Sequence, residues 1–146
     1  MTSTRIAYAL ALVSSFALAA GTSSSYTLPA AKGSMLLHQC SRLPPSDVQK
    51  FFKPEPAQVA DLEQRLGPYL DHTQSAIRLE LYNRQYVGFI KGGRRYIYGN
   101  FFKTEYRATN PASEPVVVCD GGDWFWSVIY SLDSKTFQEM QINGLA

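Results

Sequence analysis

The residues with the most chemical character stand together at Cys119-Asp120-Gly121-Gly122-Asp123. Two carboxylates that flank paired glycines are able to hold a calcium ion, because glycine lets backbone carbonyl groups turn toward the same point as the carboxylate oxygens. The spacing differs from that of the twelve-residue calcium loop, however, and the next acidic residue is Asp133. The alternative is a tight turn between strands in which the glycines adopt positive φ. We favour the turn and expect no metal site.

The sequence offers few residues for catalysis. A zinc site generally takes three or four ligands from cysteine and histidine, and the chain holds two residues of each type. A serine hydrolase needs a nucleophile beside a histidine and an acid, and the Gly-x-Ser-x-Gly elbow is absent from the sequence. A nucleophilic Cys119 assisted by His38 or His72 is an alternative that a disulfide would remove. We therefore expect no catalytic residues, no cofactor and no enzymatic activity.

Cys40 and Cys119 are the two cysteines of the chain. An isolated pair in an oxidising compartment generally forms a disulfide. The predicted Cys40–Cys119 bond closes a loop of about eighty residues, which the chain-entropy model values at about 4.5 kcal/mol. Such a bond would tie the N-terminal segment to the C-terminal strands.

Aromatic residues crowd the second half of the chain, where strands are expected. Strand alternation would place Trp124 and Trp126 on one face and Phe125 on the other. Because one helix covers only one face of a sheet, we expect some of these rings to lie exposed. Exposed tyrosine and tryptophan beside arginine are typical of a surface that binds protein or stacks on sugar. The candidate binding residues are Arg94, Arg95, Tyr96, Tyr98, Trp124 and Trp126.

Residues 1–19 have the pattern of a secretory signal peptide. Arg5 precedes an apolar run that ends at Ala17-Leu18-Ala19, with small residues at the positions that a signal peptidase reads. The apolar run is about fifteen residues long, shorter than the roughly twenty that a membrane-spanning helix needs. We expect cleavage after Ala19, a periplasmic or secreted product, and no stable membrane insertion after cleavage.

The charge balance argues against nucleic acid as a partner. Removing residues 1–19 removes Arg5 alone among the charged residues, so the formal net charge falls from +2 to about +1. A nucleic-acid binder needs a basic face that neutralises phosphates. The one dense basic cluster, Arg94-Arg95 with nearby Lys91, fits the solvated end of a hairpin.

The first half of the chain predicts one main helix. Small polar residues without apolar periodicity predict a flexible leader over 20–35. The turn residues 44–47 predict the start of a short helix that carries Val48, Phe51 and Phe52. The main helix is predicted to begin at Pro56, with an apolar face at helical spacing, and to end or kink at Gly67-Pro68.

The second half predicts strands, which cover 77–82, 86–91, 94–102, 116–118, 124–130 and 136–142. Gly92-Gly93 joins two of them in a hairpin, and Met140 and Ile142 are expected to point inward. A helix followed by a meander predicts an α+β fold in which one main helix packs on an antiparallel β-meander of about four or five strands. We expect residues 36–146 to form a single domain.

Five short patterns occur in the C-terminal half: Tyr86-x-Gly88-Phe89, Gly93-Arg94-Arg95-x-Ile97-Tyr98-x-Asn100, Val118-Cys119-Asp120-Gly121-Gly122, Phe125-x-x-Val128-x-Tyr130, and the ending from Phe137 to Asn143-Gly144-x-Ala146. Together they resemble a group of small exported bacterial proteins of unassigned function. The resemblance covers about residues 84 to 146 and implies no catalytic residue. More loosely, an exported, disulfide-closed helix with a meander resembles periplasmic inhibitors and immunity proteins, including lysozyme inhibitors.

These observations predict an exported, non-enzymatic binding domain that holds an envelope or secreted protein in the manner of an inhibitor or immunity protein. The first alternative is a carbohydrate- or peptidoglycan-binding module that uses Trp124 and Trp126. The second is a small hydrolase.

Overall fold

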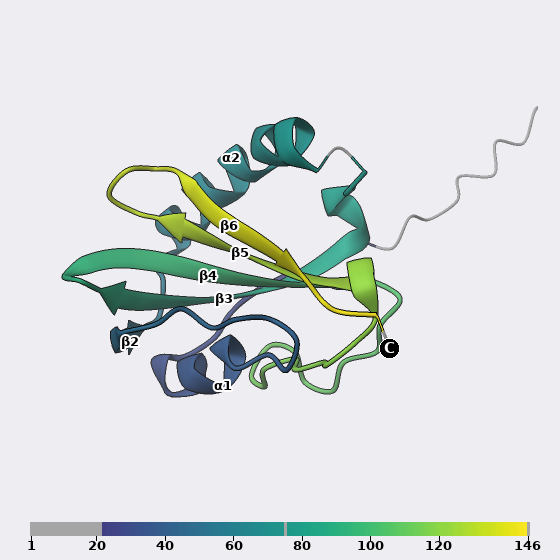
Figure 1. The fold of residues 1–146 in the computed structure, drawn as a ribbon, viewed down its shortest axis with the longest axis horizontal. Coiled ribbons are helices and arrows are strands. Elements are labelled where there is room, and N and C mark those ends of the chain that lie inside the picture. The colour runs from purple at the N-terminus through teal and green to yellow at the C-terminus, as the bar shows by residue number, and fades with distance from the viewer. Residues whose placement is uncertain (1–21, 75, 146) are drawn as a thin grey trace, which may run out of the picture.

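The computed structural model describes residues 22–74 and 76–145, apart from the side chain of residue 139 (Figure 1). The predicted signal peptide, 1–19, lies outside the described residues. The described residues form one six-stranded sheet with a helix against each face.

The main helix, α2 (Pro56–Thr73), begins where the sequence predicts. The side chains of Glu55 and Gln58 form a capping box with the backbone of the first turn, and proline occupies that turn. The helix continues through Pro68, where the sequence predicts an end or a kink. Proline removes one backbone hydrogen bond there, but Leu70 beyond it is buried against the sheet. Packing therefore outweighs the local break.

Four strands form an antiparallel meander: β3 (Tyr82–Lys91), β4 (Arg94–Lys103), β5 (Phe125–Ser131) and β6 (Phe137–Ile142). The β3–β4 turn places Gly92 and Gly93 at positive φ, as the predicted hairpin requires. Two short strands share the outer edge of β3. β1 (Ser25–Thr27) runs parallel to residues 84–86, and β2 (Val48–Phe52) runs antiparallel to residues 88–91. The predicted α+β fold, with a main helix on an antiparallel meander, is confirmed.

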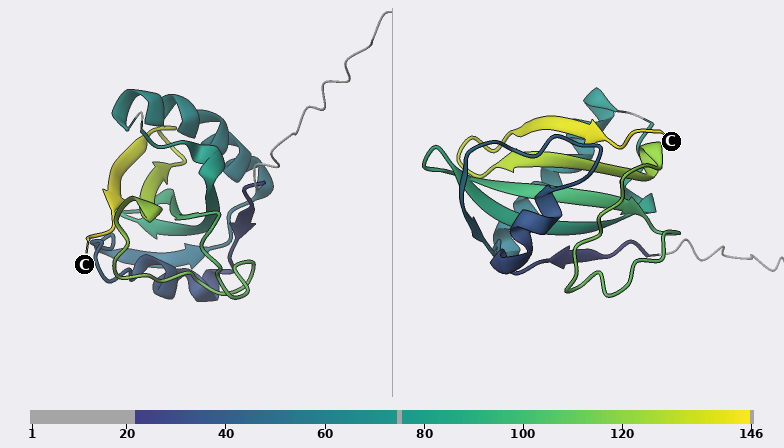
Figure 2. Two further views of the ribbon diagram at one scale, coloured as in Figure 1. Left: turned by 90° about the vertical axis from the view of Figure 1, so that its right-hand side faces the viewer. Right: turned by 60° about the horizontal axis from the view of Figure 1, so that its bottom comes forward.

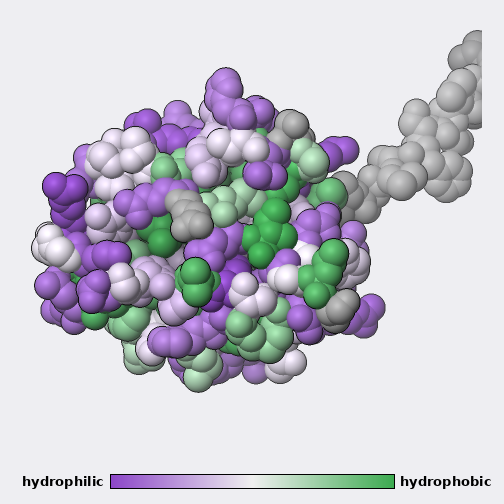
Figure 3. All heavy atoms as spheres, in the orientation of Figure 1, coloured by the Kyte–Doolittle hydropathy of each residue, from purple (hydrophilic) through white to green (hydrophobic). Residues whose placement is uncertain are grey.

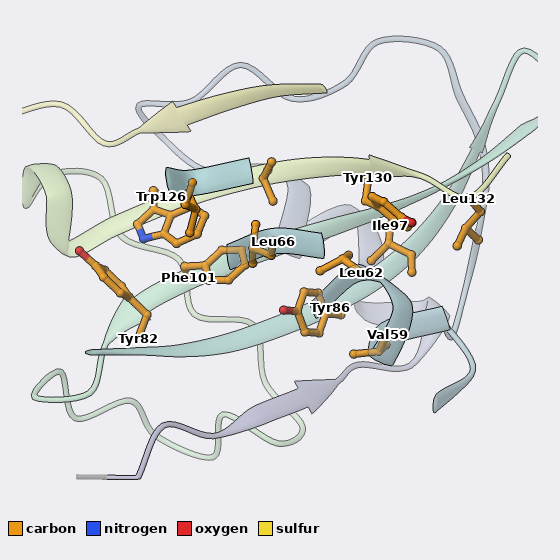
Figure 4. Packing of buried hydrophobic residues seen from close by; sticks show 12 residues of the cluster. Val59, Leu62, Leu66, Tyr82, Tyr86, Ile97, Phe101, Trp126, Tyr130 and Leu132 are labelled. Carbon is orange, nitrogen blue, oxygen red and sulfur yellow. The ribbon is translucent and has the colours of Figure 1, made fainter. Parts of the chain in front are cut away.

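Both faces of the sheet are covered, as the two views of Figure 2 show. α2 lies across one face, and α1 (Gly33–Leu37) lies against the other. Under α2, side chains of β3, β4 and β5 turn toward Val59, Leu62 and Leu66 (Figure 4). On the opposite face, Leu36 and Leu37 of α1 pack with side chains of β3 and β4. The expectation that one face would stay open is therefore wrong.

The segment 48–52 is a strand, β2, and not the predicted short helix. Neighbouring side chains of a strand point to opposite faces. Phe51 accordingly packs in the cluster beside α1, whereas Phe52 packs in the cluster beneath α2. Each ring lies over a glycine, Gly33 and Gly88 respectively, where a Cβ atom would clash with it. In a helix the two rings would point only about 100° apart and would not reach opposite faces of the sheet.

The predicted leader, 20–35, is ordered over its described residues. It contains β1, a 3-10 turn at Ala30–Lys32 and the start of α1, and Leu28 is fully buried. The backbone nitrogen of Leu28 donates to the carbonyl oxygen of Tyr86 at 2.9 Å. The prediction of a flexible leader is wrong here. A few apolar residues are enough to order a segment when a neighbouring strand supplies both the backbone hydrogen-bond partners and the apolar surface.

The predicted strand at 116–118 does not form. Val116 and Val118 instead bind amide side chains from other segments. Gln39 and Asn100 donate to the Val116 oxygen, and Gln85 accepts from the Val116 nitrogen. Asn143 donates to the Val118 oxygen, and Gln39 accepts from the Val118 nitrogen. The backbone groups of Val116 and Val118 are thus satisfied without a partner strand. The side chain of Val116 is buried in a cluster with Phe102 and Phe125.

Two smaller differences concern strand ends. Residues 79–81 form a 3-10 turn, Leu79–Leu81, so β3 begins only at Tyr82. Of the two residues of β6 expected inside, Met140 packs against the core beneath α2, whereas Ile142 is exposed.

Candidate functional site

The six predicted binding residues do not form one surface. Arg94 and Arg95 are exposed at the β3–β4 turn, as predicted. Tyr96, Tyr98 and Trp126 are buried, and only the ring of Trp124 is exposed, at 45%. The expected exposure of the three buried rings is therefore wrong. The face seen in Figure 3 likewise carries separate hydrophobic patches divided by hydrophilic residues.

Two features of the fold explain this difference. Trp126 lies under α2 and stacks on Phe101, with 3.7 Å between the ring centroids. Trp124 belongs to a 3-10 turn, Gly122–Trp124, that precedes β5, so strand alternation does not place it beside Trp126. The opposite face offers no platform either, because α1 covers Tyr98 and because Tyr96 packs on Phe89.

The predicted disulfide is present between Cys40 and Cys119, whose Cα atoms lie 4.6 Å apart. It joins the segment after α1 to the loop before β5. Because Cys119 is bonded in this way, it has no free thiol that His38 or His72 could activate as a nucleophile.

The predicted turn at 120–123 has the expected glycine geometry. Gly121 and Gly122 have φ values of +96° and +53°, a region that side chains rarely adopt. Among the described residues, no group of three or more potential metal ligands lies close together.

An exposed site of aromatic and basic character occurs elsewhere, between the C-terminal half of α2 and the β5–β6 turn. We call it the Tyr69–Phe137 groove, and its volume is about 580 Å³. The rings of Tyr69 and Phe137 form its apolar floor, with centroids 4.7 Å apart, and the Tyr69 hydroxyl donates to the backbone oxygen of Gln138. The lining residues are Gln64, Arg65, Pro68, Tyr69, Lys135, Thr136 and Phe137.

Two cations of the groove share one carboxylate. Arg65 Nε donates to Asp61 Oδ1 at 3.0 Å, and Lys135 Nζ donates to Asp61 Oδ2 at 2.9 Å. The hydroxyl of Tyr130, which rises from the core, donates to the same Oδ2 at 2.6 Å. These three donors hold the pKa of Asp61 well below its usual range, with the Tyr130 bond the largest cause. Asp61 is therefore ionised and fixes both cations beside the groove.

The burial of Tyr130 completes this arrangement. Removal from water, which is the largest cause, and the hydrogen bond to Asp61 raise the pKa of the Tyr130 hydroxyl well above its usual value. The hydroxyl therefore stays protonated and remains a donor. Since Tyr130 belongs to β5 and Asp61 to α2, this bond also fixes the helix against the strand that leads into the β5–β6 turn.

Sequence reasoning finds only half of this groove. Helical periodicity identifies the apolar face of α2 and leaves Arg65 on its solvent face. The other half, Lys135 to Phe137, comes about seventy residues later, and no local pattern joins the two. Pro68 is the one local sequence signal at the groove, and taken alone it indicates the end of a helix and not a binding site.

A second, smaller site surrounds the exposed ring of Trp124. We call it the Trp124 hollow, and its volume is about 420 Å³. Tyr106 packs edge-on against Phe125 in its wall, with 5.0 Å between centroids, and the disulfide lies at its rim. The lining residues are Tyr106, Val118, Cys119, Asp120, Gly121, Trp124 and Phe125.

Comparison with protein families, with curated proteins and with solved structures finds no match for this chain. Within residues 22–74 and 76–145, none of the helices combines the length and the apolar character needed to cross a bilayer.

Proposed function

We propose that this chain is an exported, non-enzymatic binding domain that holds a protein partner in the cell envelope, in the manner of an inhibitor or immunity protein. The observation that carries the proposal is the Tyr69–Phe137 groove. Its aromatic floor offers apolar surface for burial, and its two cations offer donors for a polar rim.

The groove is preorganised for such a contact. Phe137 packs on the buried Tyr130 as well as on Tyr69, with 4.9 Å between the Phe137 and Tyr130 centroids. Arg65 and Lys135 are held by Asp61 and keep side-chain exposures of 48% and 45%. Binding of a partner would therefore cost little entropy for ordering the side chains of the groove, which favours affinity. The Cys40–Cys119 disulfide and the signal-like pattern of residues 1–19 support an exported protein.

The test is the selection of short peptides that need the groove. Random peptides displayed on phage are enriched on the wild-type protein, and their affinity is then measured for the wild type and for Gln64→Trp. Gln64 is an exposed lining residue, so an indole ring in its place would fill the groove. The matched control is Ala112→Trp, at an exposed position of the loop between β4 and β5. We expect Gln64→Trp to weaken binding by about tenfold or more, roughly 1.4 kcal/mol, and Ala112→Trp to leave it unchanged.

Two outcomes contradict the proposal. Peptides that bind both tryptophan variants as they bind the wild type would show that their contact lies outside the groove. Failure to enrich any peptide would remove the groove as a protein-binding site.

A second candidate function, carbohydrate or peptidoglycan binding, is favoured by one observation. The exposed ring of Trp124 lies beside the carboxylate-bearing Asp120 in an open hollow, three of whose seven lining residues are aromatic. A flat ring next to hydrogen-bond acceptors suits the apolar face and the hydroxyl groups of a sugar. Titration with muropeptides, followed by the indole resonance of Trp124, tests this function. A shift that Trp124→Ala abolishes supports it, and an unmoved resonance contradicts it.

A further inference from the structure

We infer that the Tyr69–Phe137 groove selects a peptide segment in which an acidic residue is next to an aromatic one, and that Asp61 competes with that acidic side chain for the two cations. This inference rests on the proposed function. It adds the chemistry of the partner and an internal limit on its affinity.

The charge of the groove carries the first step. Two of its seven lining residues, Arg65 and Lys135, are cationic, and none of these seven described residues is acidic. Both cations are about half exposed, so a carboxylate of the partner is able to approach them from solvent. An acidic side chain is therefore the group that complements this rim.

The unused donors carry the second step. An arginine side chain has five N–H donors and a lysine side chain has three. Arg65 reaches Asp61 through Nε, so the bond to Asp61 does not use its two terminal nitrogens. Lys135 reaches Asp61 through one bond of its ammonium group. A second carboxylate is thus able to bind the same two cations without displacing Asp61 completely.

The apolar floor carries the third step. The rings of Tyr69 and Phe137 lie beside Pro68, in the same groove as the two cations. Aromatic rings prefer offset or edge-on contact with a further ring. A partner residue that fills this floor should therefore be aromatic, and an acidic residue next to it would reach the cationic rim.

Asp61 carries the fourth step, because it already neutralises part of the charge that the partner needs. Its two oxygens accept from Arg65, Lys135 and Tyr130, and it stays ionised because its pKa is lowered. Removing its charge frees both cations for the partner. The same change loses ionic bonds that stabilise the fold, so affinity and stability should move in opposite directions.

The experiment titrates two blocked dipeptides into isotopically labelled protein and follows backbone amide resonances. The probes are N-acetyl-Phe-Asp-amide and N-acetyl-Phe-Asn-amide, which differ only in the charge of one side chain. We expect the acidic probe to bind about fivefold more tightly, with the largest shifts near Tyr69 and Phe137, and the difference to shrink at high salt.

Three variants test the roles of the charges. Lys135→Gln should remove most of the preference for the acidic probe. Asp61→Asn should tighten binding of the acidic probe by about twofold or more and leave the amide probe unchanged. The matched control is Arg107→Gln, which removes an exposed cation from the loop between β4 and β5, at the opposite end of β5 from the β5–β6 turn, and should change neither affinity. The salt dependence of wild-type binding needs no variant and therefore tests the inference even if Asp61→Asn unfolds.

The outcomes separate this inference from the proposed function. Equal affinity for the two probes, or an unaltered preference in Lys135→Gln, overturns the acidic selectivity. If neither probe shifts resonances of the groove while selected peptides still require an open groove, the inference is wrong and the proposed function stands. If the selected peptides also ignore the groove, both are wrong.

Discussion

The hydroxyl of Tyr130 donates a hydrogen bond of 2.6 Å to Oδ2 of Asp61, and this bond joins the core of the sheet to the charged rim of the Tyr69–Phe137 groove. The ring of Tyr130 is fully buried in the cluster under α2, whereas the carboxylate of Asp61 reaches solvent. One residue pair therefore both fixes the main helix on β5 and positions the two cations of the groove.

Replacing Tyr130 by phenylalanine should lower the free energy of unfolding by about 2 kcal/mol, because the lost hydrogen bond has a charged acceptor. Urea unfolding of Tyr130→Phe measures this loss. The control is Tyr96→Phe, since the ring of Tyr96 is also buried and its main contact is stacking on Phe89. An equal loss in both variants would mean that the Tyr130 hydroxyl adds nothing specific.

Asp61 should make the protein acid-sensitive. Its pKa is lowered in the folded state, so its stabilising contribution is fully present above the unfolded pKa of about 4 and is lost as the pH falls below that value. We expect stability to decline from about pH 5 downward. In Asp61→Asn this part of the decline should be absent. Urea unfolding at several pH values between 3 and 7 makes the comparison, and parallel curves for the two proteins would contradict the assignment.

Local patterns are sufficient where the chain pairs with itself at short range. The β3–β4 hairpin follows from two alternating runs joined by Gly92-Gly93, and the start of α2 follows from Pro56 and its apolar spacing. In both cases the partners lie within about twenty residues along the chain, so the sequence predicts them.

Long-range pairing is not predictable from the sequence in the same way. β1 and β2 are short strands whose partner, β3, lies about forty to sixty residues away, and neither has enough residues for a clear period. The Val116–Val118 segment resembles a strand in composition, but its backbone bonds go to amide side chains from distant segments. The Tyr69–Phe137 groove likewise needs two segments that only the folded sheet brings together.

Export should remove the first nineteen residues. Arg5, the apolar run and Ala17-Leu18-Ala19 occur in the order that a signal peptidase requires. The intact mass of protein recovered from the periplasm or the medium should correspond to a chain that begins at Ala20. A full-length mass in a membrane fraction would contradict cleavage.

The Cys40–Cys119 bond should contribute substantially to stability. It spans 79 residues, and the chain-entropy model gives about 4.5 kcal/mol as an upper value for such a loop. The double variant Cys40→Ser/Cys119→Ser should unfold at clearly lower urea, and the unreduced wild type should bind no thiol reagent after unfolding. Labelling of both cysteines, or an unchanged unfolding midpoint in the double variant, would contradict the bond's structural role.

The amide of Asn100 should matter more to stability than the buried charge of Arg42, from which it accepts a hydrogen bond. Asn100 accepts from Arg42 Nη2 at 2.8 Å and donates to the Val116 oxygen at 2.9 Å, so it joins two segments that cover the sheet. Arg42 is only 4% exposed, and burial lowers the pKa of its guanidinium because the charged form loses water.

Replacing a buried, incompletely bonded charge with an apolar side chain of similar length is often neutral. Removing the Asn100 amide instead leaves the buried Arg42 guanidinium without its hydrogen-bond acceptor and takes one of two donors from the Val116 oxygen. We therefore expect Arg42→Met to change the free energy of unfolding by less than about 1 kcal/mol and Asn100→Leu to lower it by about 3 kcal/mol. Urea unfolding of both variants at pH 7 measures the contrast. If Arg42→Met is the more damaging change, the guanidinium stabilises the cover of the sheet and the predicted order of the two effects is wrong.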